Sequence, residues 1–116
     1  ADRIKDELLT FLIEQKQNGK KVTAYGAAAK GNTLLNYAGI EPDLLPYVYD
    51  AALAKQGKYL PGSHIPILPP DAMREDPPDV VLVLPWNIVE EVREQLADLT
   101  VRGVKFVTAV PELRVL

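Results

Sequence analysis

The stretch of this sequence best suited to chemistry is a glycine loop, residues 25–33, which reads Tyr-Gly-Ala-Ala-Ala-Lys-Gly-Asn-Thr. It leaves a predicted strand and enters a predicted helix. Proteins of the α/β class hold anions at such places, because free backbone N–H groups and the helix dipole face the ligand. The candidate binding residues of this loop are Gly26, Ala27, Lys30, Gly31, Asn32 and Thr33. The alternative is a tight turn whose small residues only permit close packing.

Two known motifs nearly fit this loop. Against the dinucleotide fingerprint it reads G-x-A-x-x-G, with Ala28 where the middle glycine lets the backbone approach pyrophosphate. Asp50 follows 19 residues after Gly31, so it is a candidate for binding a ribose or for fixing the loop. Against the P-loop, Asn32 replaces the required lysine. A metal-assisted NTPase is therefore disfavoured.

A second candidate segment, Leu84-Pro85-Trp86-Asn87, follows the predicted central strand. If the chain crosses back over the first strand, this segment lies beside the glycine loop, in the crevice where doubly wound folds bind ligands. Trp86 and Asn87 are then candidate substrate-binding residues. In the alternative interpretation, Trp86 is a core residue and Asn87 only caps the following helix.

The third candidate segment lies in the long irregular region of residues 51–79, which we interpret as a binding loop. Lys55 and Lys58 are the only basic residues between Lys30 and Arg74. Their positive charges suit a diphosphate ligand. The alternative is that both side chains are simply solvated. His64 is a candidate general base or substrate contact, although a loop-fixing hydrogen bond is the plainer interpretation. We predict no other catalytic residue and no metal ligand.

The three candidate segments lie between predicted strands and helices, which alternate along the chain. Apolar spacing predicts helices over residues 3–18, 33–38 and 88–101. Runs of β-branched and aromatic residues predict strands over 22–25, 47–49, 80–84 and 104–110, with an edge strand at 65–68 because of Pro66. Residues 80–84 are continuously apolar, as in a central parallel strand. The order predicts a Rossmann-like α/β fold: an open, mostly parallel sheet of four to five strands with helices on both faces.

Composition narrows the functional classes. A length of 116 residues predicts a single domain, and a net charge of −3 gives no general attraction to nucleic acid or to membranes. The absence of cysteine excludes disulfides and a cysteine nucleophile, and a single histidine excludes a multi-histidine zinc site. No apolar run is long enough to span a membrane. We expect a cytoplasmic protein.

Four motifs resemble, in order, the C-terminal domain of S-adenosylmethionine-dependent C-methyltransferases that act on nucleotide-linked deoxysugars. They lie at residues 24–37, 57–67, 84–87 and 110–116, so the resemblance runs in order over nearly the whole chain. The departures are slight: Ala28 stands where many relatives have proline, and Ser63 where threonine is frequent.

The resemblance implies a parent enzyme with a zinc-binding module, a methyl-donor domain and this third domain, which helps to hold a nucleotide-diphosphate sugar. Residues 1–116 would be that third domain, and its partners the sugar nucleotide and the methyl-donor domain. In relatives that methylate a 4-keto sugar, a base removes the proton α to the ketone and the carbanion attacks the methyl sulfonium. The base and the S-adenosylmethionine site would lie outside this chain, which we expect to be inactive alone and to hold no cofactor. Two alternatives stay open: a free-standing nucleotide or dinucleotide module, and an interaction domain whose crevice is filled by core side chains.

Overall fold

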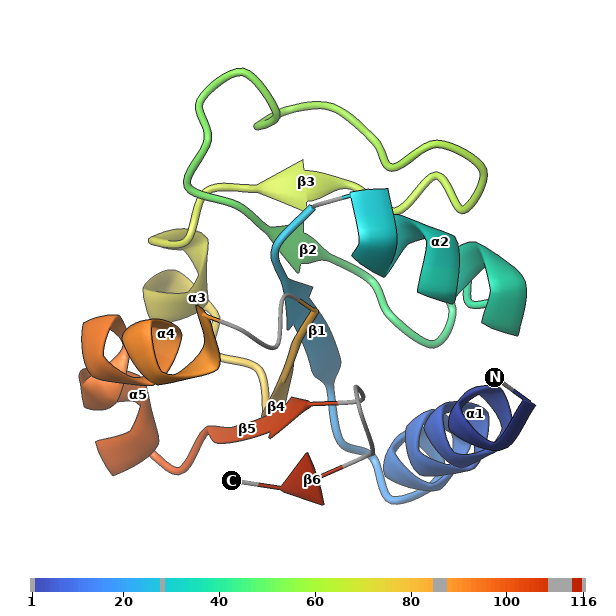
Figure 1. Ribbon diagram of the computed structural model, residues 1–116. Coiled ribbons are helices and arrows are strands. Elements are labelled where there is room, and N and C mark those ends of the chain that lie inside the picture. The colour runs from blue at the N-terminus through green and yellow to red at the C-terminus, as the bar shows by residue number, and fades with distance from the viewer. Residues whose placement is uncertain (1, 28, 85–87, 109–113, 116) are drawn as a thin grey trace.

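A six-stranded sheet, with strand order β3-β2-β1-β4-β5-β6, forms the centre of the computed structural model (Figure 1). The structure describes residues 2–27, 29–84, 88–108 and 114–115. The strands are β1 (Val22–Tyr25), β2 (Val48–Tyr49), β3 (Ile67–Leu68), β4 (Val80–Val83), β5 (Lys105–Thr108) and β6 (Arg114–Val115). The helices are α1 (Asp2–Gln17), α2 (Ala29–Ala38), α3 (Ala72–Glu75), α4 (Val89–Gln95) and α5 (Ala97–Val101).

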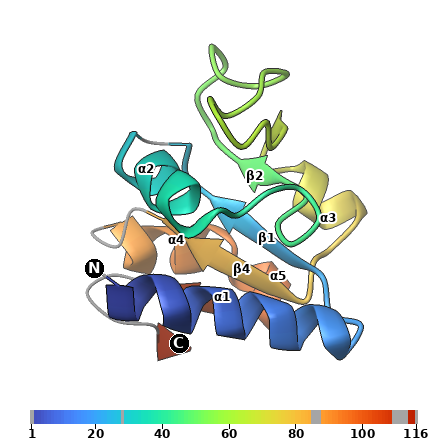
Figure 2. The ribbon, with the colours of Figure 1, turned by 90° about the vertical axis from the view of Figure 1, so that its right-hand side faces the viewer.

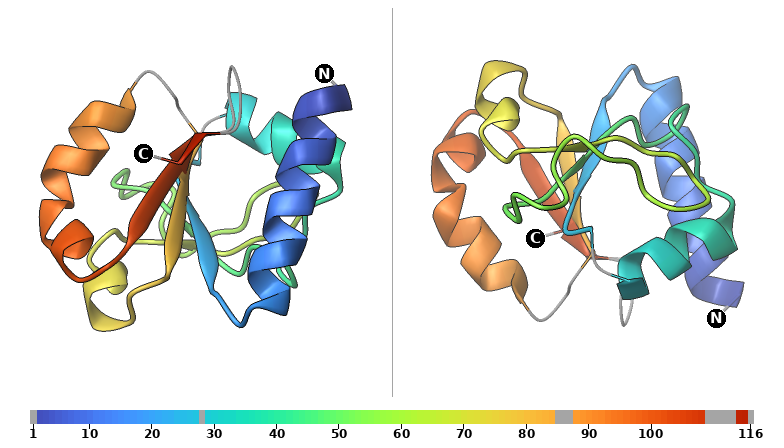
Figure 3. Two further views of the ribbon diagram at one scale, coloured as in Figure 1. Left: turned by 90° about the horizontal axis from the view of Figure 1, so that it is seen from below. Right: turned by 90° about the horizontal axis from the view of Figure 1, so that it is seen from above.

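Helices cover both faces of the sheet because neighbouring strand residues point to opposite sides. Val22, Ala24, Val80 and Leu82 join the core beneath α1 and α2, while Tyr25, Val81 and Val83 join the core beneath α3, α4 and α5. The two layers are separate in both views of Figure 3, and Figure 2 looks onto the side of α1 and α2. The predicted α/β class, with helices on both faces, is confirmed.

The topological switch point lies between β1 and β4, which are adjacent and parallel as predicted. Their register pairs Val22 with Val80 and Tyr25 with Val83. From β1 the chain moves outward to β2 and β3, and then crosses back through α3 to β4. The carboxyl ends of β1 and β4 therefore border the crevice in which such folds bind ligands. The short strand at Ile67–Leu68 forms the edge of the sheet, also as predicted.

Several predicted boundaries need correction. The helix at 33–38 begins earlier, at Ala29. The helix at 88–101 is two helices, because Leu96 leaves helical geometry with φ −112° and ψ 26°. Neither glycine nor proline lies between residues 88 and 101, so the sequence carries no signal of this break. The short α3 and the antiparallel β6 were not predicted, and β6 brings the sheet to six strands rather than four or five.

Candidate functional site

The glycine loop begins as a sharp turn at the carboxyl end of β1. Gly26 has a φ of +96°, a conformation that glycine adopts without steric cost. Its N–H donates to the Tyr49 carbonyl at 2.7 Å, which joins the loop to the end of β2. The next N–H, of Ala27, donates to Asp50 Oδ2 at 2.8 Å. Bonds to Tyr49 at the end of β2 and to Asp50 directly after it thus hold Gly26 and Ala27.

Asp50 is the centre of this hydrogen-bonded group. Its second oxygen, Oδ1, accepts the N–H of Ala52 at 2.8 Å, and Lys55 Nζ lies 3.9 Å from Oδ2. The Asp50 side chain is only 16% exposed. The carboxylate therefore links the glycine loop to the segment after β2, as expected of a loop-fixing residue. A bond from Asp50 to a ribose stays a prediction.

Gly31 lies where α2 packs against the end of β4. A Cβ atom on Gly31 would lie 2.8 Å from the Cβ of Leu84, closer than real Cβ contacts come. Leu84 in turn donates its N–H to the Tyr25 carbonyl at 3.0 Å. Close helix–strand packing is the role of the last glycine in the dinucleotide fingerprint. Gly31 is therefore needed for close packing of α2 against the end of β4, whereas Gly26 is needed for the turn.

The first turn of α2 follows the loop and contains no acidic residue. Lys30 is the second residue of this ten-residue helix. Asn32 is partly buried, and its Oδ1 lies 3.5 Å from Asn36 Nδ2. Thr33, the fifth residue of α2, is exposed. A helix start without carboxylates keeps its positive electrostatic potential, which favours an anion.

The segment after Gln56 is a hairpin rather than an irregular loop. Ile67 donates its N–H to the Lys58 carbonyl at 2.8 Å, and Leu60 donates to Ile65 at 2.9 Å. Leu60 and Ile65 are both buried in the core beneath α2. The 51–79 region therefore contains this hairpin, β3 and α3.

The hairpin turn carries His64, whose φ of +60° is uncommon outside glycine. Asn36 Nδ2 donates to the Pro61 carbonyl at 3.0 Å, so this turn contacts α2 seven residues after its start, about 10 Å along the helix. The described contacts thus tie the turn of His64 to the later part of α2.

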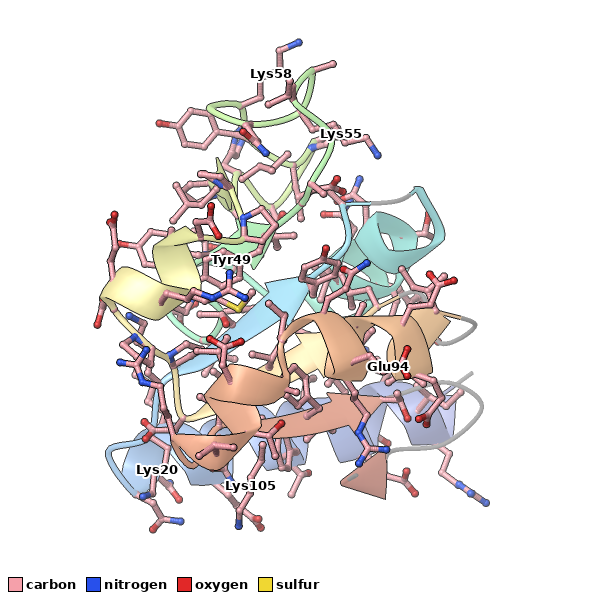
Figure 4. The ribbon with its side chains drawn as sticks, turned by 90° about the vertical axis from the view of Figure 1, so that its left-hand side faces the viewer. Lys20, Tyr49, Lys55, Lys58, Glu94 and Lys105 are labelled. Atoms are coloured by element: carbon pink, nitrogen blue, oxygen red, sulfur yellow. The ribbon has the colours of Figure 1, made fainter. Side chains whose placement is uncertain are left out.

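Lys55, by contrast, contacts the glycine loop directly. Its Nζ donates to the Ala27 carbonyl at 3.1 Å. Lys58 is exposed, and Figure 4 shows both lysines at the end of the molecule opposite Lys20 and Lys105. The sequence groups Lys55 with Lys58 and carries no sign that, among the described residues of the loop, the bond to Ala27 comes from Lys55. Trp86 and Asn87 lie outside the described residues, so their predicted roles stay predictions.

Two buried tyrosines lie next to this site. Burial, and to a smaller extent the charge of Asp50, raises the pKa of Tyr25 above its ordinary value. Burial likewise raises the pKa of Tyr49. Both side chains belong to the core beneath α3, α4 and α5, which accounts for the burial that disfavours their charged forms.

Two surface hollows lie elsewhere. One, of about 330 Å³, runs along α1 and is lined by Asp6, Glu7, Thr10, Phe11 and Glu14. The other, of about 220 Å³, lies where α5 leads into β5, beside Arg93 and Lys105. None of the helices in the described part of the chain has the length and apolar character of a membrane span. In the same part of the chain, no three side chains of the metal-binding types come together.

Comparison with known proteins decides the family. A family model described as "C-methyltransferase C-terminal domain" matches residues 1–111. The chain belongs to this family. It is also 33% identical, over 115 residues, to the C-methyltransferase NovU of Streptomyces niveus. That alignment covers 99% of this chain and 27% of the relative, so the chain spans about a quarter of the relative's length.

The family assignment confirms the resemblance seen in the four sequence motifs. The chain is the C-terminal domain of a C-methyltransferase, and the glycine loop with its Asp50 and Lys55 contacts lies at the switch point of that domain.

Proposed function

We propose that this C-methyltransferase domain binds and orients a nucleotide-diphosphate sugar at the glycine loop. One observation carries the proposal. The loop lies at the carboxyl end of β1, beside β4, and its Ala27 N–H is fixed by Asp50 just before α2 begins. In open α/β sheets, ligands bind at this topological switch point.

The charges around the loop suit a diphosphate. Two phosphates need N–H donors and at least one cation within reach. The start of α2 supplies donors without a nearby carboxylate in its first turn, and Lys30 belongs to that turn. The carboxylate of Asp50 would repel an anion, but both of its oxygens accept N–H groups and Lys55 lies beside it.

The domain would then contribute to methyl transfer by positioning the sugar nucleotide. Holding the sugar nucleotide by its diphosphate fixes the reacting carbon relative to the methyl donor, which lowers the entropic part of the barrier. The parent enzyme would use S-adenosylmethionine, bound by a domain outside this chain. The proton-abstracting base belongs to that part as well, and we assign no catalytic residue here, His64 included. We expect the parent enzyme in the cytoplasm.

Titration calorimetry of the 116-residue chain tests this function. UDP-glucose and dTDP-glucose are suitable probes, since they share the diphosphate and differ in the base. We expect saturable binding of at least one probe, weakened about 10–150-fold in Lys30→Ala because a charge-assisted bond is lost. Lys20→Ala is the matched control, because Lys20 is an exposed lysine at the opposite end of the sheet (Figure 4). Absence of heat with both probes, or an equal loss in the two variants, would contradict the proposal.

A further inference from the structure

The segment of residues 51–56 joins β2 to the hairpin and lies against the glycine loop. Residues 51–55 are all exposed, and its single large apolar side chain, Leu53, is 84% exposed. The segment is therefore not anchored by burial of apolar surface. Its attachment depends on polar contacts, and segments of this kind open locally at low free energy.

The described contacts that join this segment to the glycine loop and to the end of β2 lead to Asp50 or Ala27. Ala52 donates its N–H to Asp50 Oδ1 at 2.8 Å, and Gln56 Nε2 donates to the Asp50 carbonyl at 2.9 Å. Lys55 Nζ donates to the Ala27 carbonyl at 3.1 Å and lies 3.9 Å from Asp50 Oδ2. Lys55 is thus the side chain of this segment that reaches across to the glycine loop.

We infer that residues 51–56 form a strap that closes over the glycine loop, held shut by Lys55 with Asp50 as its fixed point. Both ends of the strap are joined to β3 by backbone hydrogen bonds. Asp50 is tied to the sheet by its N–H bond to the Leu68 carbonyl at 3.0 Å, and Gly57 by its N–H bond to Ile67 at 2.9 Å. Gly57 has a φ of +81°, so the chain turns sharply where the strap ends.

The strap would also respond to an anion in the loop. An ammonium group has three N–H donors, and the Lys55 side chain is 45% exposed, so it can bond to a phosphate without leaving the Ala27 carbonyl. An anion bound there would add a contact that exists only when the strap is closed. This part of the inference depends on the proposed function, whereas closure by Lys55 and Asp50 in the free protein does not.

Amide hydrogen exchange, followed by NMR, tests the strap in the 116-residue chain. The amides of Ala27 and Ala52 report on it, because both donate to Asp50. The amide of Gly26 is an internal control, since it donates to the Tyr49 backbone. We expect Lys55→Met to speed exchange at Ala27 and Ala52 roughly two- to fivefold, the range for losing an exposed charged contact, and to leave Gly26 unchanged. Lys55→Arg should restore slow exchange, and Lys58→Met should have no effect.

Unchanged exchange in Lys55→Met, or equal acceleration at all three amides, would overturn the strap. Adding UDP separates the two proposals. If the strap closes on a diphosphate, UDP slows exchange at Ala52 in the natural chain and not in Lys55→Met. If Lys55→Met speeds exchange but UDP changes nothing in either chain, the strap stands and binding of a diphosphate at the glycine loop is overturned.

Discussion

Gly31 and Leu84 approach each other so closely that a single added methyl group does not fit between them. The Cβ of Leu84 lies 2.8 Å from the position that a Cβ on Gly31 would take. Since Leu84 is fixed by its backbone bond to Tyr25, the atom that would have to move is next to the main chain. This contact sets how near the start of α2 lies to the end of β4.

Gly31→Ala should destabilise the domain. Helix propensity alone would favour alanine by about 1 kcal/mol, but forcing an atom into a packed site costs about 1–3 kcal/mol. We expect a net loss of about 1 kcal/mol in the free energy of unfolding, measured in urea. Gly39→Ala is a useful comparison, because its cost comes from backbone strain alone. The φ of Gly39 is +70°, and nothing lies within 4 Å of an added Cβ. A gain in stability for Gly31→Ala would refute the close contact.

The raised tyrosine pKa values predict loss of stability in alkali. Burial disfavours the tyrosinate form of Tyr25 and Tyr49, so their pKa values in the folded state exceed the ordinary value of 10.0. Their stabilising contribution is therefore complete below pH 10 and declines as the pH rises through the folded-state values. Urea unfolding between pH 8 and pH 11 should show the decline, and a flat profile would contradict it.

Asp50→Asn should change the pKa of Tyr25 but not that of Tyr49. Removing the negative charge should lower the pKa of Tyr25, because the Asp50 charge is part of its shift, and should leave the pKa of Tyr49 unchanged. NMR titration of the two rings can follow this, with Asp43→Asn as the control for an exposed carboxylate elsewhere. A shift of both tyrosines together would mean that the substitution disturbs the whole strand end.

The isolated chain should not bind the methyl donor. Apart from the glycine loop, nothing in the chain resembles a cofactor site, and the loop departs from the dinucleotide fingerprint at Ala28. Calorimetry with S-adenosylmethionine should therefore give no heat of binding. Micromolar affinity would instead mean that the glycine loop binds the methyl donor and not the sugar nucleotide.

The sequence allowed a good prediction of the parallel sheet and a partial one of the site. The apolar runs at Val22–Tyr25 and Val80–Val83 are strong signals, because a buried central strand must be apolar on both faces. The break at Leu96 and the pairing of β6 depend on tertiary packing, which leaves no local residue signal.

The site was predictable where the backbone requires a special residue type. Gly26 has a positive φ and Gly31 lies in a close contact, and both were singled out by the spacing of the loop. The partnership of Asp50 with Ala52 and Lys55 depends on how the chain after β2 folds back. Lys55 and Lys58 are equivalent in the sequence, and only the turn between them decides which one reaches the loop.

The kinetics of Lys30→Ala in the full-length parent enzyme test the central claim most directly. If this domain holds the sugar nucleotide by its diphosphate at the start of α2, the KM for the sugar nucleotide should rise about 10–150-fold. The KM for S-adenosylmethionine should stay unchanged, and Lys20→Ala should alter neither constant. Unchanged constants for Lys30→Ala, or an equal rise for both substrates, would contradict the claim that the glycine loop binds the sugar nucleotide.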